Sequence, residues 1–202
     1  MMKPLCEYEY RIWSYDRPVI GIDEAGRGPL AGPLVVAGVV LPLYYYHPDI
    51  NDSKKLSAKK RRMLYDIIAN EAIAFSIDIV DVIEIDRLNI YQATKRSMEK
   101  IALYLPAKDV LIDAMPINSE KNTLSLIKGD AKSISIAAAS ILAKVTRDMI
   151  MDEYDLIYPE YQFKKNKGYP TKTHIDALNV FGYTPIHRKS YQPVALSKRI
   201  KY

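Results

Sequence analysis

Two acids and a glycine-flanked arginine lie between two apolar segments near the start of the chain. Asp23 and Glu24 follow apolar residues 19–22, and Gly26-Arg27-Gly28 comes directly after them. Paired carboxylates at the end of a strand suit metal binding, and glycines let a backbone approach a phosphate without interference from Cβ atoms. A hairpin turn with incidental acids would have the same spacing, because turns commonly contain Asp, Gly and Pro. These residues alone leave both interpretations open.

The pattern of apolar residues predicts a mixed sheet covered by helices, an α/β fold. Alternating or continuous apolar runs predict strands at about 19–23, 34–41, 74–80, 109–113 and 123–127. A 3.6-residue period predicts helices from about 57, with Ser57 as N-cap, and at about 90–105, 135–151 and 171–180. Strands joined first by a tight bend and later by helices favour this class of fold.

Two more acids follow predicted strands. Asp113 ends the strand at 109–113, and Asp130 comes shortly after the strand at 123–127. Open α/β sheets bind ligands at the carboxyl ends of their strands, so these acids and the Asp23-Glu24 pair are candidates for one cluster. Their repulsion would require a cation, and oxygen ligands favour Mg²⁺ or Mn²⁺ over zinc. The alternative is that Asp113 and Asp130 are ordinary strand-end or helix-cap acids.

Length and composition indicate one globular domain. The chain has 202 residues, a formal net charge of +5 and a single cysteine, Cys6. The positive charge weakly favours a polyanionic partner, and one cysteine excludes both an internal disulfide and a multi-cysteine zinc site. The longest apolar run, 33–43, is too short to span a bilayer, and the first residues do not resemble a signal peptide. We therefore expect a cytoplasmic protein with no membrane role.

Six segments in one order resemble the bacterial ribonuclease HII enzymes of the ribonuclease H-like fold. The resemblance covers nearly the whole chain, with Tyr191 at a position where the family more often has Phe. The segments that carry it are 21–33, 52–57, Asp113, 128–130 with 136–148, 166–171 and 187–194.

The resemblance implies a metal-dependent endonuclease. Such an enzyme hydrolyses the RNA strand of RNA/DNA hybrids and cuts 5′ to ribonucleotides embedded in duplex DNA, leaving 5′-phosphate and 3′-hydroxyl ends. By position, the metal ligands and catalytic residues would be Asp23, Glu24, Asp113 and Asp130. They would hold two Mn²⁺ or Mg²⁺ ions about 3.5–4 Å apart when substrate is bound. A monomer is expected, with RNA/DNA hybrid and ribonucleotide-containing duplex DNA as its partners.

The same resemblance implies a five-stranded mixed sheet flanked by helices, with a small helical element at the C-terminus. The whole chain, 1–202, would form one catalytic domain, with a core at about 18–182 and an extension at 183–202.

The substrate contacts divide between the bend and later segments. Backbone groups of Gly26, Arg27 and Gly28 would sense the 2′-hydroxyl, and Tyr169 would stack on the sugar after the ribonucleotide, favouring an RNA–DNA junction. Further contacts are expected from the second motif and from the alanine-rich helix: Lys54, Lys55, Ser140, Lys144, Thr146 and Arg147. Lys144 and Arg147 are three residues apart and can reach one side of that helix, although ion pairs to Asp148 or Glu153 are the alternative. The basic run 59–62 is expected to form a solvated helix face.

Other chemistries fit less well. The bend lacks the Lys and Ser/Thr of a nucleotide-binding loop, and no Gly-x-Ser-x-Gly elbow is present. His47, His174 and His187 do not have metal-ligand spacing, and His187 is expected to be structural. A glycosidase would not need four carboxylates. A catalytically silent binding module of the same fold remains the main alternative. Within the same group of enzymes the competing identification is ribonuclease HIII, whose usual N-terminal domain would not fit in the 22 residues before Asp23.

Overall fold

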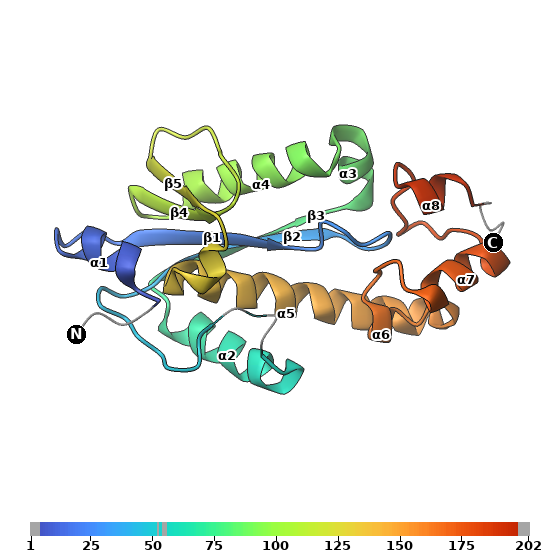
Figure 1. Cartoon of the computed structure of the whole chain (residues 1–202), viewed down its shortest axis with the longest axis horizontal. Helices are drawn as coiled ribbons and strands as arrows, with labels where there is room; N and C mark the ends of the chain where they lie inside the picture. The colour runs from blue at the N-terminus through green and yellow to red at the C-terminus, as the bar shows by residue number, and fades with distance from the viewer. Residues whose placement is uncertain (1–4, 52, 54–55, 198–202) are drawn as a thin grey trace.

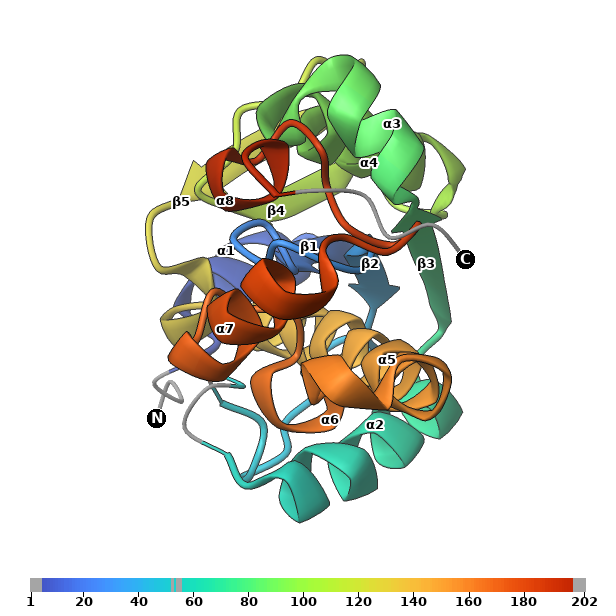
Figure 2. The same ribbon diagram turned by 90° about the vertical axis from the view of Figure 1, so that its right-hand side faces the viewer.

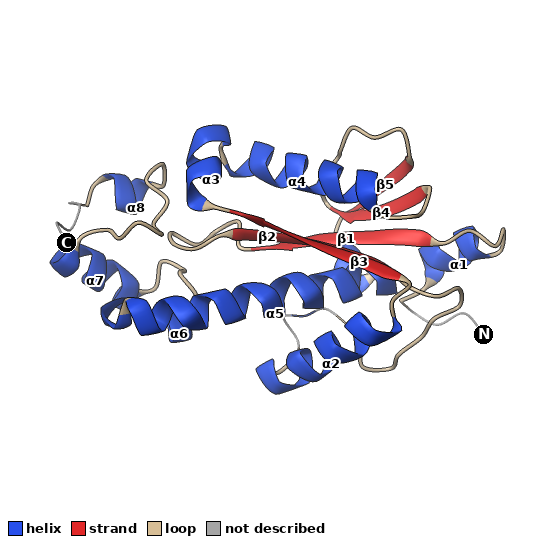
Figure 3. Ribbon diagram, turned by 180° about the vertical axis from the view of Figure 1, so that it is seen from behind, coloured by secondary structure: helices blue, strands red, loops and turns tan. Residues whose placement is uncertain are grey.

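The computed structural model describes residues 5–51, 53 and 56–197, which form a five-stranded sheet between two layers of helices (Figures 1 and 3). The strands lie in the order β3-β2-β1-β4-β5. In chain order the elements are α1 (Glu7–Trp13), β1 (Val19–Ala25), β2 (Leu34–Val40), α2 (Ala58–Glu71), β3 (Ala74–Val80), α3 (Val82–Leu88), α4 (Ile90–Tyr104), β4 (Asp109–Asp113), β5 (Asn122–Leu126), the 3₁₀ turn η2 (Gly129–Ala131), α5 (Ile134–Ile157), the 3₁₀ turn η3 (Pro159–Tyr161), α6 (Phe163–Asn166), α7 (Lys172–Phe181) and α8 (Gln192–Ala195).

The pairing of the central strand β1 sets the position of the acids. β1 runs antiparallel to β2 and parallel to β4. In the parallel ladder Ile22 lies opposite Ile112, so the next residues, Asp23 and Asp113, lie side by side on adjacent strands. The predicted meeting of acids at strand ends therefore follows from register for this pair.

Each face of the sheet has its own apolar core. Ile20 and Ile22 of β1 pack with Met98 in the cluster under α4, whereas Val19 belongs to the cluster under α5, as the two-residue period of a strand requires. Figure 2 shows α3 and α4 on one side of the sheet and α2 and α5 on the other. None of the helices in the described ranges is long and apolar enough to cross a membrane.

A third apolar cluster joins the loop after β1 to the end of the described chain. Leu30 and Ala31 of that loop pack with Phe163, Ile186 and Val194, among others. The segment after residue 182 therefore packs against the loop that carries Gly26-Arg27-Gly28.

The strands and the long helices agree closely with those predicted from the sequence, and Ser57 caps α2 by accepting a hydrogen bond from the Lys60 N–H. Helix α5 extends beyond the predicted 135–151 and ends before Pro159. The short helices α1 and α3 were not predicted. α1 depends on a distant contact, because its buried Glu9 accepts hydrogen bonds from Ser133 and from the Ser135 N–H at the start of α5. No local pattern reveals such a contact.

Gly21 lets α5 lie directly on β1, and this closeness can be tested. A Cβ atom at Gly21 would lie 2.1 Å from the Ser135 backbone carbon, whereas one at Gly38 of β2 would meet the Ile101 and Leu105 side chains of the other layer. Overpacking a core costs about 1–3 kcal/mol when side chains can adjust. In urea unfolding we expect Gly38→Ala to lower the free energy of unfolding by an amount within that range, and Gly21→Ala to lower it by more. Equal losses would show that α5 can shift away from β1.

Candidate active site

Two of the four predicted acids, Asp23 and Glu24, line a cleft of about 390 Å³, whereas Asp113 and Asp130 are not among its lining residues. β1 supplies Asp23 and Glu24 to its wall, and the loop that follows supplies Gly26, Arg27 and Gly28. α5 contributes Ser140 and Lys144, and the loop after α6 contributes Tyr169. The structure thus brings together residues that are up to 146 positions apart in the sequence, from Asp23 to Tyr169.

Asp23 is the buried centre of the acid cluster. Burial raises its pKa well above the ordinary value of 3.8, and the neighbouring charges of Glu24 and Asp113 raise it further. Two hydrogen bonds act in the opposite direction, from the Glu24 N–H, at 2.7 Å, and from the Ser140 hydroxyl. Ser140 is itself 2.8 Å from the hydroxyl of Ser53. These contacts fix the orientation of the carboxylate while its charge stays unfavourable.

The turn that carries Asp130 and leads into α5 packs against Asp113. The Gly129 N–H donates to Asp113 Oδ1 at 2.6 Å, and a Cβ atom at Gly129 would lie only 3.3 Å from that oxygen. Asp130, the next residue, is buried in this turn. Glycine at 129 therefore lets the turn carrying Asp130 pack on the end of β4.

The donor chemistry of this cluster fits a hard divalent cation. Within the described ranges, no three His, Cys, Asp or Glu side chains lie close enough to enclose a metal ion by themselves. Mg²⁺ usually takes only one or two protein carboxylates and completes its shell with water and substrate phosphate. The mutual repulsion that raises the pKa of Asp23 is the physical sign of carboxylates that lack sufficient neutralisation. Carboxylate oxygens with an excess of negative charge are the ligands that Mg²⁺ prefers.

Two buried arginines hold the loop after β1 by its carbonyl groups. Arg188 donates to the Gly26 carbonyl at 2.6 Å and to the Arg27 carbonyl at 3.0 Å. The Tyr191 hydroxyl donates to the same Arg27 carbonyl at 2.7 Å, a contact that the more usual Phe would lack. In a planar trans peptide the N–H points opposite to the C=O, so the N–H groups of Arg27 and Gly28 point away from Arg188.

Arg147 does not have the role that its spacing predicted. It was expected to reach phosphate together with Lys144, but it is 1% exposed, and its guanidinium donates to the carbonyls of Ala31, Pro33 and Lys167. Gly26, with φ +104°, leaves room for it, because a Cβ atom there would lie 2.3 Å from Arg147 Nε. Arg147 therefore supports the loop from below and lines only the floor of the cleft.

The other predicted residues of α5 lie on different faces. Lys144 lines the cleft and forms an ion pair with Asp148, so the alternative considered for it is correct in part. Thr146 is not among the cleft residues, and its hydroxyl oxygen is buried. A substrate contact by Thr146 does not fit this geometry. At 100° per residue, Thr146 lies about 240° around the helix from Ser140 and so points to another face.

Tyr169 lines the cleft beside the loop after β1. Its side chain is 43% exposed, and a Cβ atom at Gly28 would be 3.6 Å from Tyr169 Cε1. The Leu30 N–H donates to the Gly168 carbonyl at 2.8 Å, which joins the two loops directly. The structure thus brings the two loops expected to contact substrate next to each other in the lining of one cleft.

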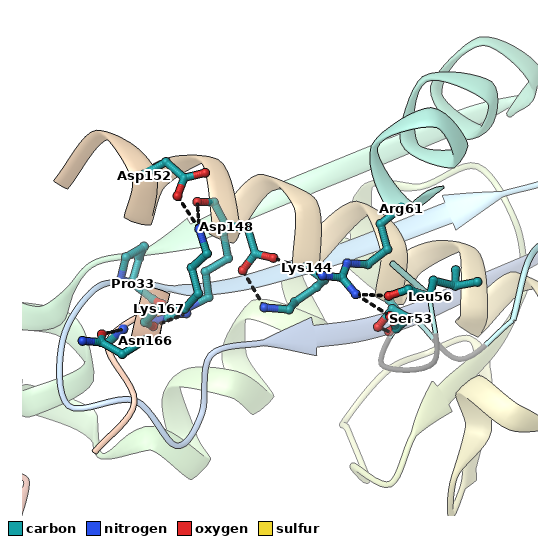
Figure 4. A network of polar contacts seen from close by, with 12 residues as sticks. Pro33, Ser53, Leu56, Arg61, Lys144, Asp148, Asp152, Asn166 and Lys167 are labelled. Carbon is teal, nitrogen blue, oxygen red and sulfur yellow. Dashed lines mark hydrogen bonds and ion pairs between the residues drawn. The ribbon is translucent and has the colours of Figure 1, made fainter. Parts of the chain in front are cut away.

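The basic run 59–62 is not a uniformly solvated face. Arg61 donates to the carbonyls of Ser53 at 2.9 Å and Leu56 at 2.6 Å, and it lies 3.7 Å from Asp148 (Figure 4). It thereby attaches the second motif to α5. Lys54 and Lys55, the substrate contacts expected from that motif, lie outside the described residues.

Comparison with known proteins agrees with this geometry. The family model "Ribonuclease HII" matches residues 20–194. A ribonuclease HII of Listeria innocua is 54% identical over 89% of this chain and 70% of its own, and one of Enterococcus faecalis is 54% identical over 96% and 77%. The crystal structure of ribonuclease H2 from Pyrococcus horikoshii superposes with a TM-score of 0.73 at 25% identity, covering 88% of this chain and 95% of that one.

The chain belongs to the ribonuclease HII family. It is therefore an endonuclease of the ribonuclease H type, and its sheet has the ribonuclease H-like fold. Metal binding is consistent with this family. Membership sets aside the glycosidase interpretation and leaves the individual roles of the cleft residues to be derived from the site.

Several residues that build this site were not predicted from the sequence. Ser53, Arg61 and Arg188 lie inside or beside segments that carried the resemblance, but nothing in their spacing indicated which contacts they make. Nothing in the sequence paired His174 with His187, which are 13 residues apart, yet their Nε2 atoms lie 3.0 Å from each other. The one signal in the sequence was the run of residues 187–191, in which a His-Arg pair comes three residues before the unusual Tyr191.

The raised pKa of Asp23 predicts how the stability of this ribonuclease HII depends on pH. Below the ordinary value of 3.8 the carboxyl group is protonated in both folded and unfolded states, so it carries no penalty. As pH rises through the higher folded pKa, the buried group must ionise and stability falls. In chelator, Asp23→Asn is expected to be more stable than the wild type at pH 7, and the difference should vanish near pH 4. Urea unfolding across this range measures it, and a less stable variant at pH 7 would contradict the electrostatic account.

Proposed function

We propose that this cleft hydrolyses the phosphodiester on the 5′ side of a ribonucleotide, either embedded in duplex DNA or within the RNA strand of an RNA/DNA hybrid. The products would carry 5′-phosphate and 3′-hydroxyl ends. The observation that supports this best is the shared opening, in which the Asp23-Glu24 pair adjoins Gly26-Arg27-Gly28 and faces Tyr169. Action as a monomer in the cytoplasm is part of the same proposal.

Asp23, Glu24, Asp113 and Asp130 would hold two divalent ions, Mn²⁺ or Mg²⁺, together with the substrate. When bound, such ions lower the pKa of a coordinated water and neutralise charge that develops on the phosphate. The chain contributes orientation, because Ser140 and the Glu24 N–H direct the oxygens of Asp23. Arg27 lies 3.6 Å from Glu24. Once a divalent cation takes the place of Arg27 beside Glu24, the guanidinium would be free to bind a neighbouring phosphate.

Recognition of the ribonucleotide would use the loop after β1. Pro29 has no N–H, and the Leu30 N–H is already bonded to the Gly168 carbonyl. The inward carbonyls of Gly26 and Arg27 direct the N–H groups of Arg27 and Gly28 away from Arg188. These two donors suit a 2′-hydroxyl, which both donates and accepts hydrogen bonds. Tyr169 would stack on the next sugar and favour deoxyribose there.

Lys144 and Ser140 would contribute differently from each other. Ser140 is buried and bonded to Asp23 and Ser53, so we assign it to orientation of the carboxylate. Lys144 borders the cleft and would meet the phosphate backbone, with Asp148 holding its ammonium group in place.

A duplex DNA that contains one ribonucleotide tests the reaction. With Mg²⁺ or Mn²⁺, mapping of the product should show one cut 5′ to the ribonucleotide, and chelator should abolish it. Loss of an outer-shell partner of a metal costs about 10–100-fold, so loss of the ligand in Asp23→Asn should lower kcat/KM by more than about 100-fold.

Binding must be measured on the same variant. Asp23→Asn is expected to retain affinity for uncut duplex in chelator, which separates lost chemistry from lost recognition. Metal-independent cutting, or full activity of Asp23→Asn, would rule out the proposed metal site. An inactive wild type that still binds hybrid would favour the silent binding module.

Tyr169→Ala tests recognition of the junction. Stacking of an aromatic ring on a nucleotide is worth about 1–3 kcal/mol, or roughly 5- to 150-fold. The variant should lose this factor in kcat/KM on duplex with a single ribonucleotide, and much less on uniform RNA/DNA hybrid. Equal losses on both substrates would show that Tyr169 does not read the junction.

A further inference from the structure

Two buried histidines connect the end of the described chain to the backbone of Tyr169. The Thr184 N–H lies 3.0 Å from His187 Nδ1, and His187 Nε2 lies 3.0 Å from His174 Nε2. His174 Nδ1 in turn lies 2.9 Å from the Tyr169 carbonyl oxygen. A continuous row of hydrogen bonds therefore runs from the C-terminal segment to the loop that borders the cleft.

The two ends of this row determine where its protons lie. A backbone N–H can only donate, so His187 Nδ1 accepts from Thr184 and its proton must be on Nε2. A carbonyl can only accept, so His174 carries its proton on Nδ1 and accepts at Nε2. Both ends require the same direction, with His187 donating to His174 and His174 donating to Tyr169. The Thr184 hydroxyl, 2.8 Å from His187 Nδ1, can donate to the same nitrogen, so one tautomer of each ring satisfies every contact.

The surroundings keep both rings neutral and fixed. His174 and His187 are fully buried, and they pack against the stacked rings of Tyr161 and Phe163. Burial, together with the adjoining His174, lowers the pKa of His187 to about 3. Burial also lowers the pKa of His174. Near neutral pH a second proton is therefore excluded, and the direction of the hydrogen bonds does not change.

The loop that receives these hydrogen bonds has a demanding backbone. Lys167 has φ +50° and Gly168 has φ +81°, both in the left-handed region. A residue other than glycine in this region is held there by its surroundings. The Tyr169 carbonyl receives the Thr171 N–H at 2.8 Å in addition to His174 Nδ1. The position of the half-exposed Tyr169 ring thus depends on contacts made by its own backbone.

We propose that His174 and His187 are positioning residues for recognition of the RNA–DNA junction, because they fix the backbone of Tyr169 so that its ring meets the sugar after the ribonucleotide. This inference rests on the proposed function, in which Tyr169 reads that sugar. Neither histidine touches substrate. Their effect passes through Tyr169, so it must disappear when the Tyr169 ring is absent.

The experiment compares two substrates in each enzyme preparation. The measured quantity is the ratio of kcat/KM on duplex DNA with a single ribonucleotide to kcat/KM on uniform RNA/DNA hybrid. A lower folded fraction reduces both rates equally and leaves this ratio unchanged. The variants are His174→Phe, which removes the donor to Tyr169, and His174→Asn, whose amide nitrogen lies where Nδ1 was and can still donate. Asn179→Ala, at an exposed position of the same helix, is the control.

We expect His174→Phe to lower the ratio by about 2- to 10-fold, the effect of one neutral hydrogen bond. His174→Asn should recover most of the ratio, and Asn179→Ala should match the wild type. In the Tyr169→Ala background, His174→Phe should cause no further change, because coupled residues are not additive. His187→Leu, which removes the donor to His174, should follow the same pattern with a smaller loss.

Two results separate the ways of failing. If Tyr169→Ala lowers the ratio but His174→Phe does not, or if the two losses simply add, the positioning role is overturned and the proposed function stands. If Tyr169→Ala leaves the ratio unchanged while the enzyme still cuts at ribonucleotides, the reading role of Tyr169 is wrong, and the positioning role is overturned with it.

Discussion

The close packing of α5 on β1 at Gly21 is the contact on which the rest of the site depends. A strand and a helix can approach this closely only where one residue has no side chain. The approach brings Ser140 within reach of Asp23 and places Arg147 beneath the loop that follows β1. The same helix carries Lys144 along the cleft. One glycine in the middle of the sheet therefore sets the relation between the acids and the groups that orient them.

The acid cluster is unfavourable in the protein alone, and this is consistent with its proposed use. Asp23 is buried beside Glu24 and Asp113, and each of these effects raises its pKa. The parallel register of β1 and β4 makes the approach unavoidable, because Asp23 and Asp113 each follow directly after the paired residues Ile22 and Ile112. A fold that keeps such repulsion offers a divalent cation a strong electrostatic gain on binding. The oxygens are already oriented, so little of that gain would be lost to reorganisation.

The sequence predicted this site wherever position along an element decides the outcome. Asp23 and Asp113 follow apolar strands of clear period, so their meeting follows from the sheet. Failures occurred where the direction of a side chain matters: Arg147 is buried under a loop, and Thr146 points to another face of α5. Arg61 likewise binds carbonyls that follow no periodic pattern. The histidine pair was missed because α7 and the loop after it bring together residues 13 positions apart. Such contacts depend on how separate elements pack, which local pattern does not encode.

The two buried arginines also explain how a loop of few residues can be both rigid and positively charged. Arg147 and Arg188 bind mainly backbone carbonyls, whose partial charges orient a guanidinium without neutralising it. Burial and the charge of Arg188 together lower the pKa of Arg147 to about 10, yet the group stays protonated at neutral pH. Carboxylate partners would have held the loop equally well but would have added negative charge beside a phosphate. Carbonyl partners leave the positive charge available to the cleft, and by turning inward they direct the N–H groups of Arg27 and Gly28 away from the arginine. The same hydrogen bonds thus set the shape of this loop and keep positive charge beside it, which suits the proposed role in binding a nucleic acid.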